Sequence, residues 1–252
     1  MKDINVGIQL YSVRDEIKEY GVDEVFKTLS ECGCNTVEFA GFYGLTPTEM
    51  KEKLEKYSLR PLAAHIRATD IIASLPYIDE LGIKMVYIPG YSIDLLSSEE
   101  GFKEFCDIVQ GIKPELDRRG VRFGYHNHAK ELLGEDLLIK MAKSIEGFTI
   151  ELDIYWAKAA GKEPAELIAE YGSAISALHI KDMDNKADTK NHDELPNAII
   201  GEGQCNTEAA FNKAYENGVD TYILEVEYYP CPYAEYIKKS VDNINEYYKN
   251  AK

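Results

Sequence analysis

The chain has 252 residues, of which 28 are Lys or Arg and 44 are Asp or Glu, so its formal net charge is −16. This excess of negative charge repels phosphate backbones and anionic lipids, which argues against a nucleic-acid or membrane partner. The chain has no signal-peptide pattern at its start and no run near the roughly 18 apolar residues of a membrane span. We therefore expect a soluble cytoplasmic protein. The five scattered cysteines suit a reducing compartment better than a disulfide framework.

A short apolar, β-rich run followed by a stretch with helical spacing recurs along the whole chain. In chain order, the predicted strand and helix pairs are 6–10 with 15–31, 36–39 with 47–57, 62–65 with 70–81, 85–88 with 99–119, 122–126 with 132–145, 149–153 with 164–171, 177–180 with 207–217, and 222–225 with 233–248. No linker or low-complexity tract divides these pairs. The pattern therefore predicts one domain over residues 1–252.

Strict alternation of strands and helices indicates a parallel sheet, and eight such units in about 250 residues predict a (β/α)₈ TIM barrel of the α/β class. An open doubly wound sheet is the alternative fold. That fold usually carries a glycine-rich phosphate loop after its first strand. Here residues 9–14 read QLYSVR, which contains no glycine. The barrel is therefore favoured.

Polar side chains gather at the carboxyl ends of the predicted strands, where TIM barrels place their active sites. They are Gln9 and Tyr11, Glu38, His65, Tyr87, His126 and His128, Glu151 and Asp153, His179 and Lys181, and Glu225 and Glu227. Side chains two residues apart on a strand share a face, so several strands can direct imidazoles and carboxylates to one point. The alternative to a shared site is that each of these side chains forms its own hydrogen bond at the end of a strand and has no functional role.

Imidazole and carboxylate together suit Mn²⁺, Zn²⁺, Co²⁺ or Fe²⁺ better than Ca²⁺, which prefers oxygen ligands alone. Without a counter-ion, carboxylates that point into one barrel mouth would repel one another and raise one another's pKa. We therefore predict one divalent metal ion per chain.

Several motifs resemble those of the xylose isomerase-like TIM barrels, the sugar phosphate isomerase/epimerase superfamily. They are VGIQLYSVR at 6–14, TVEFAG at 36–41, GYHNH at 124–128, ELDIYW at 151–156, LHIKDM at 178–183, IGEG at 200–203 and ILEVE at 223–227. The resemblance covers nearly the whole chain. As an ordered set the motifs are specific for the superfamily but not for any one substrate.

The resemblance implies a single divalent metal held by an acid, acid, His, acid set from four strands. Asp153, His179 and Glu225 match its second, third and fourth positions. In many sugar epimerases of the family the first position is a Glu, and here His126 stands in its place. This replacement argues against a symmetric mechanism with two metal-bound glutamates as the bases.

Three residues are candidates for moving protons or stabilising charge. Lys181 should point the same way as His179, so it could polarise a carbonyl, stabilise an enediolate or act as an acid. A salt bridge of Lys181 with Glu225 or Glu227 is the structural alternative. His128 is the best candidate for proton transfer, and Glu225 could act with it as a base.

Aromatic and polar residues near the strand ends could bind a sugar, whose C–H faces favour aromatic walls and whose hydroxyl groups need hydrogen bonds. The expected substrate contacts are Tyr11, Glu38, His65, Trp156 and Glu202, with Tyr91 and Tyr155 as further stacking candidates. Glu202 belongs to the polar segment 182–204, which we expect to be a lid because long loops at this end of a barrel commonly are.

The leading functional hypothesis is a metal-dependent isomerase or epimerase of a ketose or related small sugar, which acts through an enediolate. The second is a dehydratase or lyase of a keto-sugar or keto-inositol, which His126 in the ligand set favours. An abasic-site endonuclease also shares this superfamily, but the −16 charge and five histidines argue against it. A non-catalytic sugar or metal-binding protein stays open, as does homo-oligomer formation. Few basic residues beyond Lys181 and Arg67 stand at the strand ends, which favours a neutral sugar.

Overall fold

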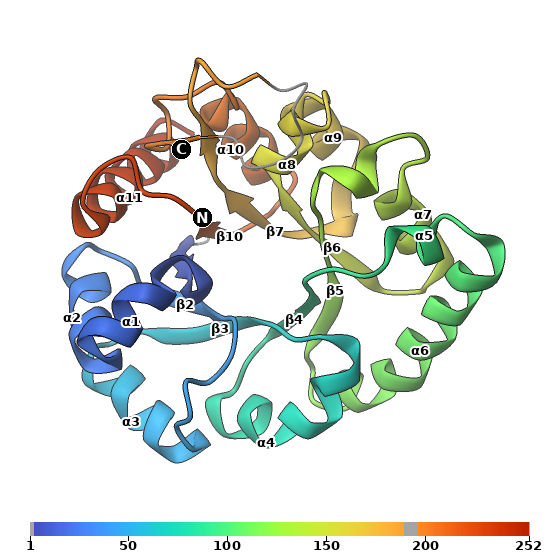
Figure 1. The fold of residues 1–252 in the computed structure, drawn as a ribbon, viewed down its shortest axis with the longest axis horizontal. Helices are drawn as coiled ribbons and strands as arrows, with labels where there is room; N and C mark the ends of the chain where they lie inside the picture. Colours follow the sequence, from blue (N-terminus) through green and yellow to red (C-terminus); the bar gives the residue numbers. More distant parts are fainter. Residues whose placement is uncertain (1–2, 189–195, 252) are drawn as a thin grey trace.

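Parallel strands close into a barrel in the computed structural model, which describes residues 3–188 and 196–251 (Figure 1). Around the barrel the hydrogen-bonded order is β1-β10-β7-β6-β5-β4-β3-β2. The strands are β1 (Asn5–Gln9), β2 (Thr36–Phe39), β3 (Arg60–His65), β4 (Met85–Ile88), β5 (Arg122–His126), β6 (Phe148–Asp153), β7 (Ile175–Ile180) and β10 (Thr221–Leu224). The TIM barrel and the positions of its eight strands are therefore confirmed.

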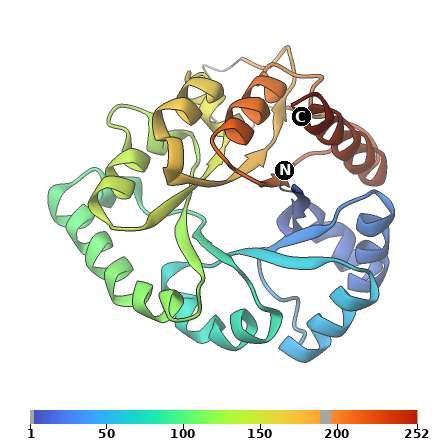
Figure 2. The same ribbon diagram turned by 180° about the vertical axis from the view of Figure 1, so that it is seen from behind.

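Helices surround the barrel on all sides, as the view from behind also shows (Figure 2). They are α1 (Arg14–Tyr20), α2 (Val22–Glu31), α3 (Pro47–Lys56), α4 (Ile71–Leu81), α5 (Ile93–Leu96), α6 (Glu99–Asp117), α7 (Leu137–Ser144), α8 (Ile154–Ala159), α9 (Pro164–Tyr171), α10 (Thr207–Glu216) and α11 (Tyr233–Asn250). Among the described residues none of these helices combines the length and the apolar character needed to cross a bilayer.

Several segments differ from the elements that the sequence predicts, and they include the short helices α5 and α8, which the sequence does not predict. The single helix expected over 15–31 is two helices, because Gly21 adopts φ 83° between α1 and α2. The helix expected from residue 132 begins at Leu137, after a 3₁₀ turn over Ala129–Leu132. Within the expected lid, β8 (Asp182–Met183) pairs antiparallel with β9 (Asn197–Ala198). Residues 189–195 of that segment lie outside the described part of the chain.

Alternation along the strands divides the side chains between two environments. One set, such as Val37, Val86, Leu178 and Leu224, belongs to the large apolar core of the strands and the surrounding helices. The other set points into the barrel, where Ala63, Met85, Tyr87 and Ala177 form a separate apolar cluster. The polar residues that end the strands continue this inward-facing set.

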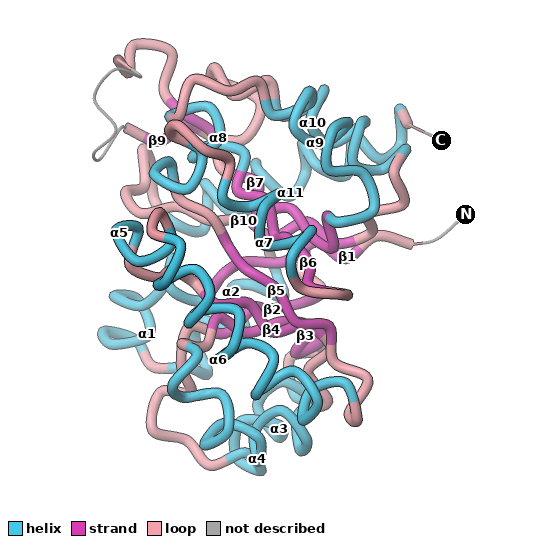
Figure 3. The backbone as a smooth tube through the Cα atoms, turned by 90° about the vertical axis from the view of Figure 1, so that its right-hand side faces the viewer, coloured by secondary structure: helices cyan, strands magenta, loops and turns pink. Residues whose placement is uncertain are grey.

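The two ends of the barrel differ in what they carry. Seen from the side, both chain termini lie at one end, and α5, α8 and β9 lie toward the other (Figure 3). These three short elements follow β4, β6 and β7 along the chain, so they mark the end where the strands finish. The structure thus assembles the predicted polar residues at a single end of the barrel.

Candidate metal centre and active site

Four side chains from four strands meet at this end of the barrel, and they are the four predicted metal ligands. His126 and Asp153 end β5 and β6, His179 lies in β7, and Glu225 follows β10 directly. One ligand atom from each residue lies within 4.8 Å of the others, and all four side chains are buried. The four side chains lie close together because each stands at the carboxyl end of its strand, and they point to one place because each lies on the inward face of its strand.

The spacing around His179 suits a small cation. Its Nδ1 atom lies 3.1 Å from Glu225 Oε2 and 3.9 Å from Asp153 Oδ2. Ligands about 2.0–2.2 Å from a tetrahedral ion lie about 3.3–3.6 Å apart, which is close to these separations. Asp153 Oδ1 accepts a hydrogen bond from the Trp156 amide, whereas Asp153 Oδ2 is buried without a hydrogen-bond partner. This unpartnered acceptor fits a cation in the centre of the set.

Two of these groups, His126 and Asp153, have protonation tendencies that fit a bound cation. Burial lowers the pKa of His126 well below its ordinary value, so the ring is neutral and has a lone pair to donate. Burial, opposed by Lys181 and aided by Glu225, raises the pKa of Asp153 to about 8. A bound divalent cation would favour the ionised form of Asp153 and offset this cost of burial. For His179, burial lowers the pKa, but the carboxylates of Glu151, Glu38 and Glu225 outweigh burial and raise the pKa well above its ordinary value, so an ion would bind this ring with displacement of a proton. The donor set therefore fits a divalent ion.

Two further buried carboxylates, Glu38 and Glu151, lie next to the candidate ligands, and both contact His65, which is partly buried and also lines the cavity described below. Glu38 Oε2 lies 2.6 Å from His179 Nε2 and accepts a hydrogen bond from Gln9 Nε2 at 2.8 Å. Glu38 thus contacts a candidate ligand, His179; its expected contact with a substrate hydroxyl group stays a prediction. Glu151 Oε2 lies 2.6 Å from His65 Nε2.

Glu151 and Gln9 contact this group of residues, although the sequence indicates only their positions at strand ends and predicts no role for either. The available signal for Glu151 was its position two residues before Asp153, which places both carboxylates on the same face of β6. Gln9 ends β1 in the same way and lies opposite Glu38 in the β1–β2 pairing.

A cavity of about 510 Å³ opens next to the ligand set. Its lining includes two of the candidate ligands, His126 and Glu225, and three further expected functional residues, namely Tyr11, His65 and His128. The remaining walls come mainly from the segments that follow β2 and β3. Their polar and aromatic members are Phe42, Arg67, Asp70 and Ser74. The cavity can therefore admit a small polar molecule to the candidate ligands.

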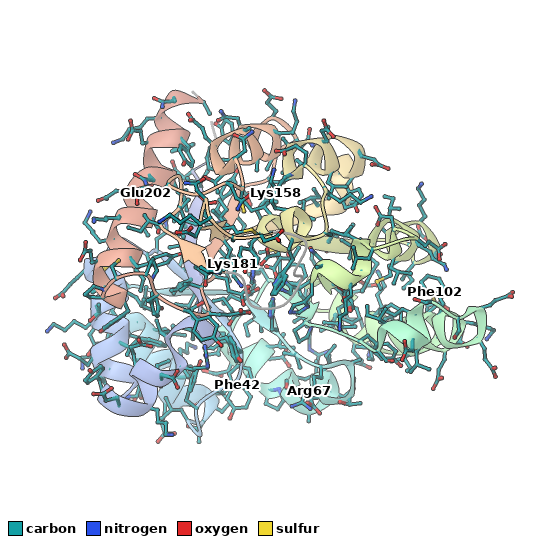
Figure 4. All side chains as sticks on the ribbon, turned by 45° about the horizontal axis from the view of Figure 1, so that its top comes forward. Phe42, Arg67, Phe102, Lys158, Lys181 and Glu202 are labelled. Carbon is teal, nitrogen blue, oxygen red and sulfur yellow. The ribbon has the colours of Figure 1, made fainter. Side chains whose placement is uncertain are left out.

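Lys181 is completely buried beside this cavity, over the centre of the barrel (Figure 4). Its Nζ atom lies 3.3 Å from Glu227 Oε1, and Glu227 in turn lines the cavity. The ammonium group also lies 4.4 Å from the ring centre of Tyr155 and 4.9 Å from that of Trp156, which are cation–π distances. From the sequence, Glu225 and Glu227 are both candidate salt-bridge partners of Lys181, and the structure shows the contact with Glu227.

Two of the expected substrate contacts lie elsewhere. Trp156 is only 8% exposed and is not part of the cavity lining; its ring packs against His128 at a centroid distance of 5.4 Å. Glu202 is exposed on the side of α11 and is also absent from the lining (Figure 4). Trp156 therefore packs against His128 and does not line the cavity itself. Glu202 lies outside the residues that line this cavity.

The carboxylate of Asp182 accepts hydrogen bonds from four backbone amides of segment 182–205, most of which was expected to be a lid. Its Oδ2 atom accepts hydrogen bonds from the amides of Gly201 and Gly203, each at 3.0 Å. Its Oδ1 atom accepts from Met183 at 2.8 Å and from Cys205 at 3.0 Å. One buried carboxylate thus ties the returning part of the segment to the end of β7.

Comparison with known proteins gives a family and a fold. Residues 26–247 match the family model of the xylose isomerase-like TIM barrel. No curated protein sequence gives a match to the chain. The family that the motifs resembled is therefore confirmed by the family model.

Solved structures share the fold along almost the whole chain. A sugar phosphate isomerase/epimerase from Parabacteroides distasonis superposes with a TM-score of 0.76 at 22% identity, and the match covers 96% of this chain and 93% of that one. A D-allulose 3-epimerase from Methylomonas sp. gives 0.73 at 12% identity, covering 98% and 99%. An L-ribulose 3-epimerase gives 0.71 at 11% identity, covering 98% and 95%. Because these sequence identities are 22% or lower, the similarity to the solved structures shows a shared fold and nothing more.

Proposed function

The chain belongs to the xylose isomerase-like TIM barrel family, and from this premise we propose that it is a metal-dependent isomerase or epimerase of a ketose or related small sugar. The observation that carries the proposal is the meeting of His126, Asp153, His179 and Glu225 next to a cavity, which His126 and Glu225 line. A divalent ion held there would supply Lewis-acid polarisation of a substrate carbonyl, which acidifies the adjacent C–H bond. Epimerases among the solved structures with this fold support the substrate class by analogy.

His128 and Glu225 are the groups that we assign to proton transfer, because both line the cavity. Burial lowers the pKa of His128, so its ring is neutral near pH 7 and can accept a proton. Burial opposes ionisation of Glu225, but His179, Lys181 and His126 together outweigh burial and hold the pKa of this carboxyl well below its ordinary value. A neutral imidazole and a carboxylate thus face the same space.

A dehydratase or lyase of a keto-sugar or keto-inositol is the second candidate function. It starts with the same removal of a proton next to a carbonyl but then expels a β-leaving group. His126 favours it, because an imidazole in the first ligand position leaves one carboxylate, Glu225, beside one imidazole, His128, as unlike proton-transfer groups. One base and one acid suffice for an elimination.

We infer that the substrate is uncharged. Arg67 is the one Lys or Arg among the residues that line the cavity, and its side chain is 81% exposed and lies 3.9 Å from Asp70. A phosphate group would ordinarily be met by several charge-assisted hydrogen bonds. The walls that the described residues form offer mainly hydroxyl, imidazole and carboxylate groups, which suit sugar hydroxyl groups.

The reaction class can be tested with neutral ketoses, 3-keto-sugars and inososes incubated in D₂O with the metal-loaded enzyme. An isomerase or epimerase should introduce carbon-bound deuterium without loss of water, and a dehydratase should produce new enone absorbance. An active substrate that acquires no carbon-bound deuterium would contradict the proposed proton transfer. Preference for the phosphorylated form of a substrate would contradict the uncharged-substrate inference alone.

The ligand set can be tested by elemental analysis of protein purified without chelator. We expect close to one Mn, Zn, Co or Fe ion per chain, and we expect Asp153→Asn to lose the ion while its far-UV circular dichroism is unchanged. Asp70→Asn, at the exposed rim of the same cavity, is the control and should keep the ion. Wild-type metal content in Asp153→Asn would show that the ligand assignment is wrong.

A further inference from the structure

One carboxylate oxygen next to the candidate metal centre faces three imidazole rings. Glu151 Oε2 lies 2.6 Å from His65 Nε2, 3.2 Å from His179 Nε2 and 3.4 Å from His126 Nδ1. Glu151 is completely buried, and the four side chains come from β3, β5, β6 and β7. Two of the three rings, those of His126 and His179, are candidate metal ligands.

These four residues also have the composition of a metal site, so two overlapping sets share His126 and His179. Their geometries differ. Ligand atoms on a tetrahedral ion lie about 3.3–3.6 Å apart, whereas His65 Nε2 and Glu151 Oε2 are separated by 2.6 Å. This is the distance of a short, charge-assisted hydrogen bond. The set around Glu151 therefore acts as a support, with one hydrogen bond to His65 and longer ion-pair contacts of 3.2 and 3.4 Å to His179 and His126. The set with Asp153 and Glu225, whose Asp153 Oδ2 atom has no hydrogen-bond partner, forms the cation site.

The His179 ring connects the two sets through its opposite nitrogen atoms. Nε2 faces Glu151 and Glu38, at 3.2 and 2.6 Å, while Nδ1 faces Glu225 at 3.1 Å. A hydrogen bond from one ring nitrogen to a carboxylate determines the tautomer and directs the lone pair of the other nitrogen. His126 faces Glu151 through Nδ1, which leaves Nε2 to bind an ion.

We propose that Glu151 is a positioning residue that orients both imidazole ligands, His126 and His179, through one carboxylate oxygen. The proposal rests on the metal centre proposed above and goes beyond it, because it assigns the orientation of two ligands to a residue outside the ligand set. Glu38 has a narrower role, since its contacts join it to His179, His65 and Gln9. Glu151 alone of these two carboxylates lies within salt-bridge distance of both imidazole ligands.

Replacing Glu151 with Gln keeps the size of the side chain but removes its charge and half of its acceptor capacity. If the amide NH₂ group faces the rings, it opposes their N–H groups and favours other ring tautomers. Loss of such an outer partner typically weakens metal binding 10–100-fold. Glu131→Gln is the matched control, because Glu131 is an equally buried carboxylate after β5 whose hydrogen bonds go to the Tyr125 hydroxyl and the His128 amide.

The experiment is a titration of metal-free protein with Co²⁺, followed by calorimetry and by visible absorption, which reports the coordination geometry. Wild type and Glu131→Gln should bind one Co²⁺ per chain with the same affinity and spectrum. Glu151→Gln should bind about 10–100-fold more weakly with altered absorption bands. The histidine tautomers, read by ¹⁵N NMR in the Zn²⁺-loaded protein, should differ in Glu151→Gln alone.

Three results would overturn the proposal. Wild-type affinity and spectrum in Glu151→Gln would show that the support has no influence on the centre, while the proposed function would stand. Two ions in the wild type and one in Glu151→Gln would make Glu151 a ligand. Failure of the wild type to bind Co²⁺ would contradict the metal centre itself. Should Glu151→Gln fail to fold, Glu151→Asp keeps the charge but withdraws the oxygen by one methylene, and it should show the same loss.

Discussion

Lys181 shows how one side chain can serve the fold and the chemistry together. Its ammonium group is completely buried against two aromatic rings and lies 3.3 Å from Glu227, which lines the cavity. An isolated buried charge is costly, so the carboxylate and the rings account for its presence there. Lys181 can act on a substrate directly or through Glu227, and measurement of a variant separates these roles from packing.

We predict that Lys181→Met keeps the metal but lowers kcat by about 10²-fold or more, the usual effect of losing a positioned proton donor or charge stabiliser. Metal content and steady-state rates on an identified substrate provide the test. Lys158→Met is the control, since Lys158 lies in α8 near the same end and pairs with Glu163 at 3.0 Å. An unchanged kcat in Lys181→Met would assign Lys181 a structural role only.

At the scale of single elements, the β5–β6 contact holds two candidate ligands in place. Gly124 pairs with Thr149, and His126 pairs with Glu151 two residues further along. A Cβ atom on Gly124 would lie 2.3 Å from the Thr149 carbonyl oxygen and 2.7 Å from its hydroxyl oxygen. Only glycine allows β5 to approach β6 this closely.

We therefore predict that Gly124→Ala destabilises the protein by about 1–3 kcal/mol, the usual cost of overpacking, and weakens metal binding by displacing His126. Chemical unfolding and Co²⁺ titration measure the two effects. Gly111→Ala is the control with the opposite sign, because Gly111 is exposed in α6 with nothing within 4 Å of its added Cβ atom. That variant should gain about 0.5–1 kcal/mol. A stable Gly124→Ala protein would contradict the close-approach argument.

The elements also show where local patterns fail. Spacing of apolar residues predicted the long helices well, because each buries one face against the barrel. It missed the break at Gly21, since an apolar pattern can continue through a change of direction. It also missed β8 and β9, because two residues are too few to show any period and the pairing joins residues that are far apart along the chain.

For the whole molecule, closure of the barrel depends on β1 and β10, which pair in parallel from Asn5 with Thr221 to Ile8 with Leu224. These strands come from opposite ends of the chain. The candidate ligands come from β5, β6, β7 and the end of β10, which are consecutive neighbours in the sheet, whereas Glu38 of β2 reaches His179 from the other side of the barrel. The contacts that support the ligands therefore depend on the closed barrel. A single domain over the whole chain remains our prediction.

Metal binding should therefore stabilise the folded chain as one unit. At a free ion concentration of 100 times Kd, the gain is about 2.7 kcal/mol, which raises Tm by about 5–10 °C for a domain of this size. Differential scanning calorimetry with Zn²⁺ or EDTA should show one transition that shifts with the ion. Asp153→Asn should show no shift. Two separate transitions would contradict the single domain, and an unshifted wild-type transition would contradict the metal centre.

The sequence by itself determined the alternation of strands and helices and the end of the barrel that carries the polar residues. These follow from short-range regularities: the period of each element, and the rule that alternate residues of a strand share a face. The candidate ligand set of His126, Asp153, His179 and Glu225 came from the resemblance of the motifs to the family and remains a proposal. The tertiary structure alone decided which groups touch. Glu38 meets His179 across 141 positions of the chain, Lys181 takes Glu227 as its partner, and Glu151 faces three rings. Such contacts depend on barrel closure and register between strands, which no local pattern encodes.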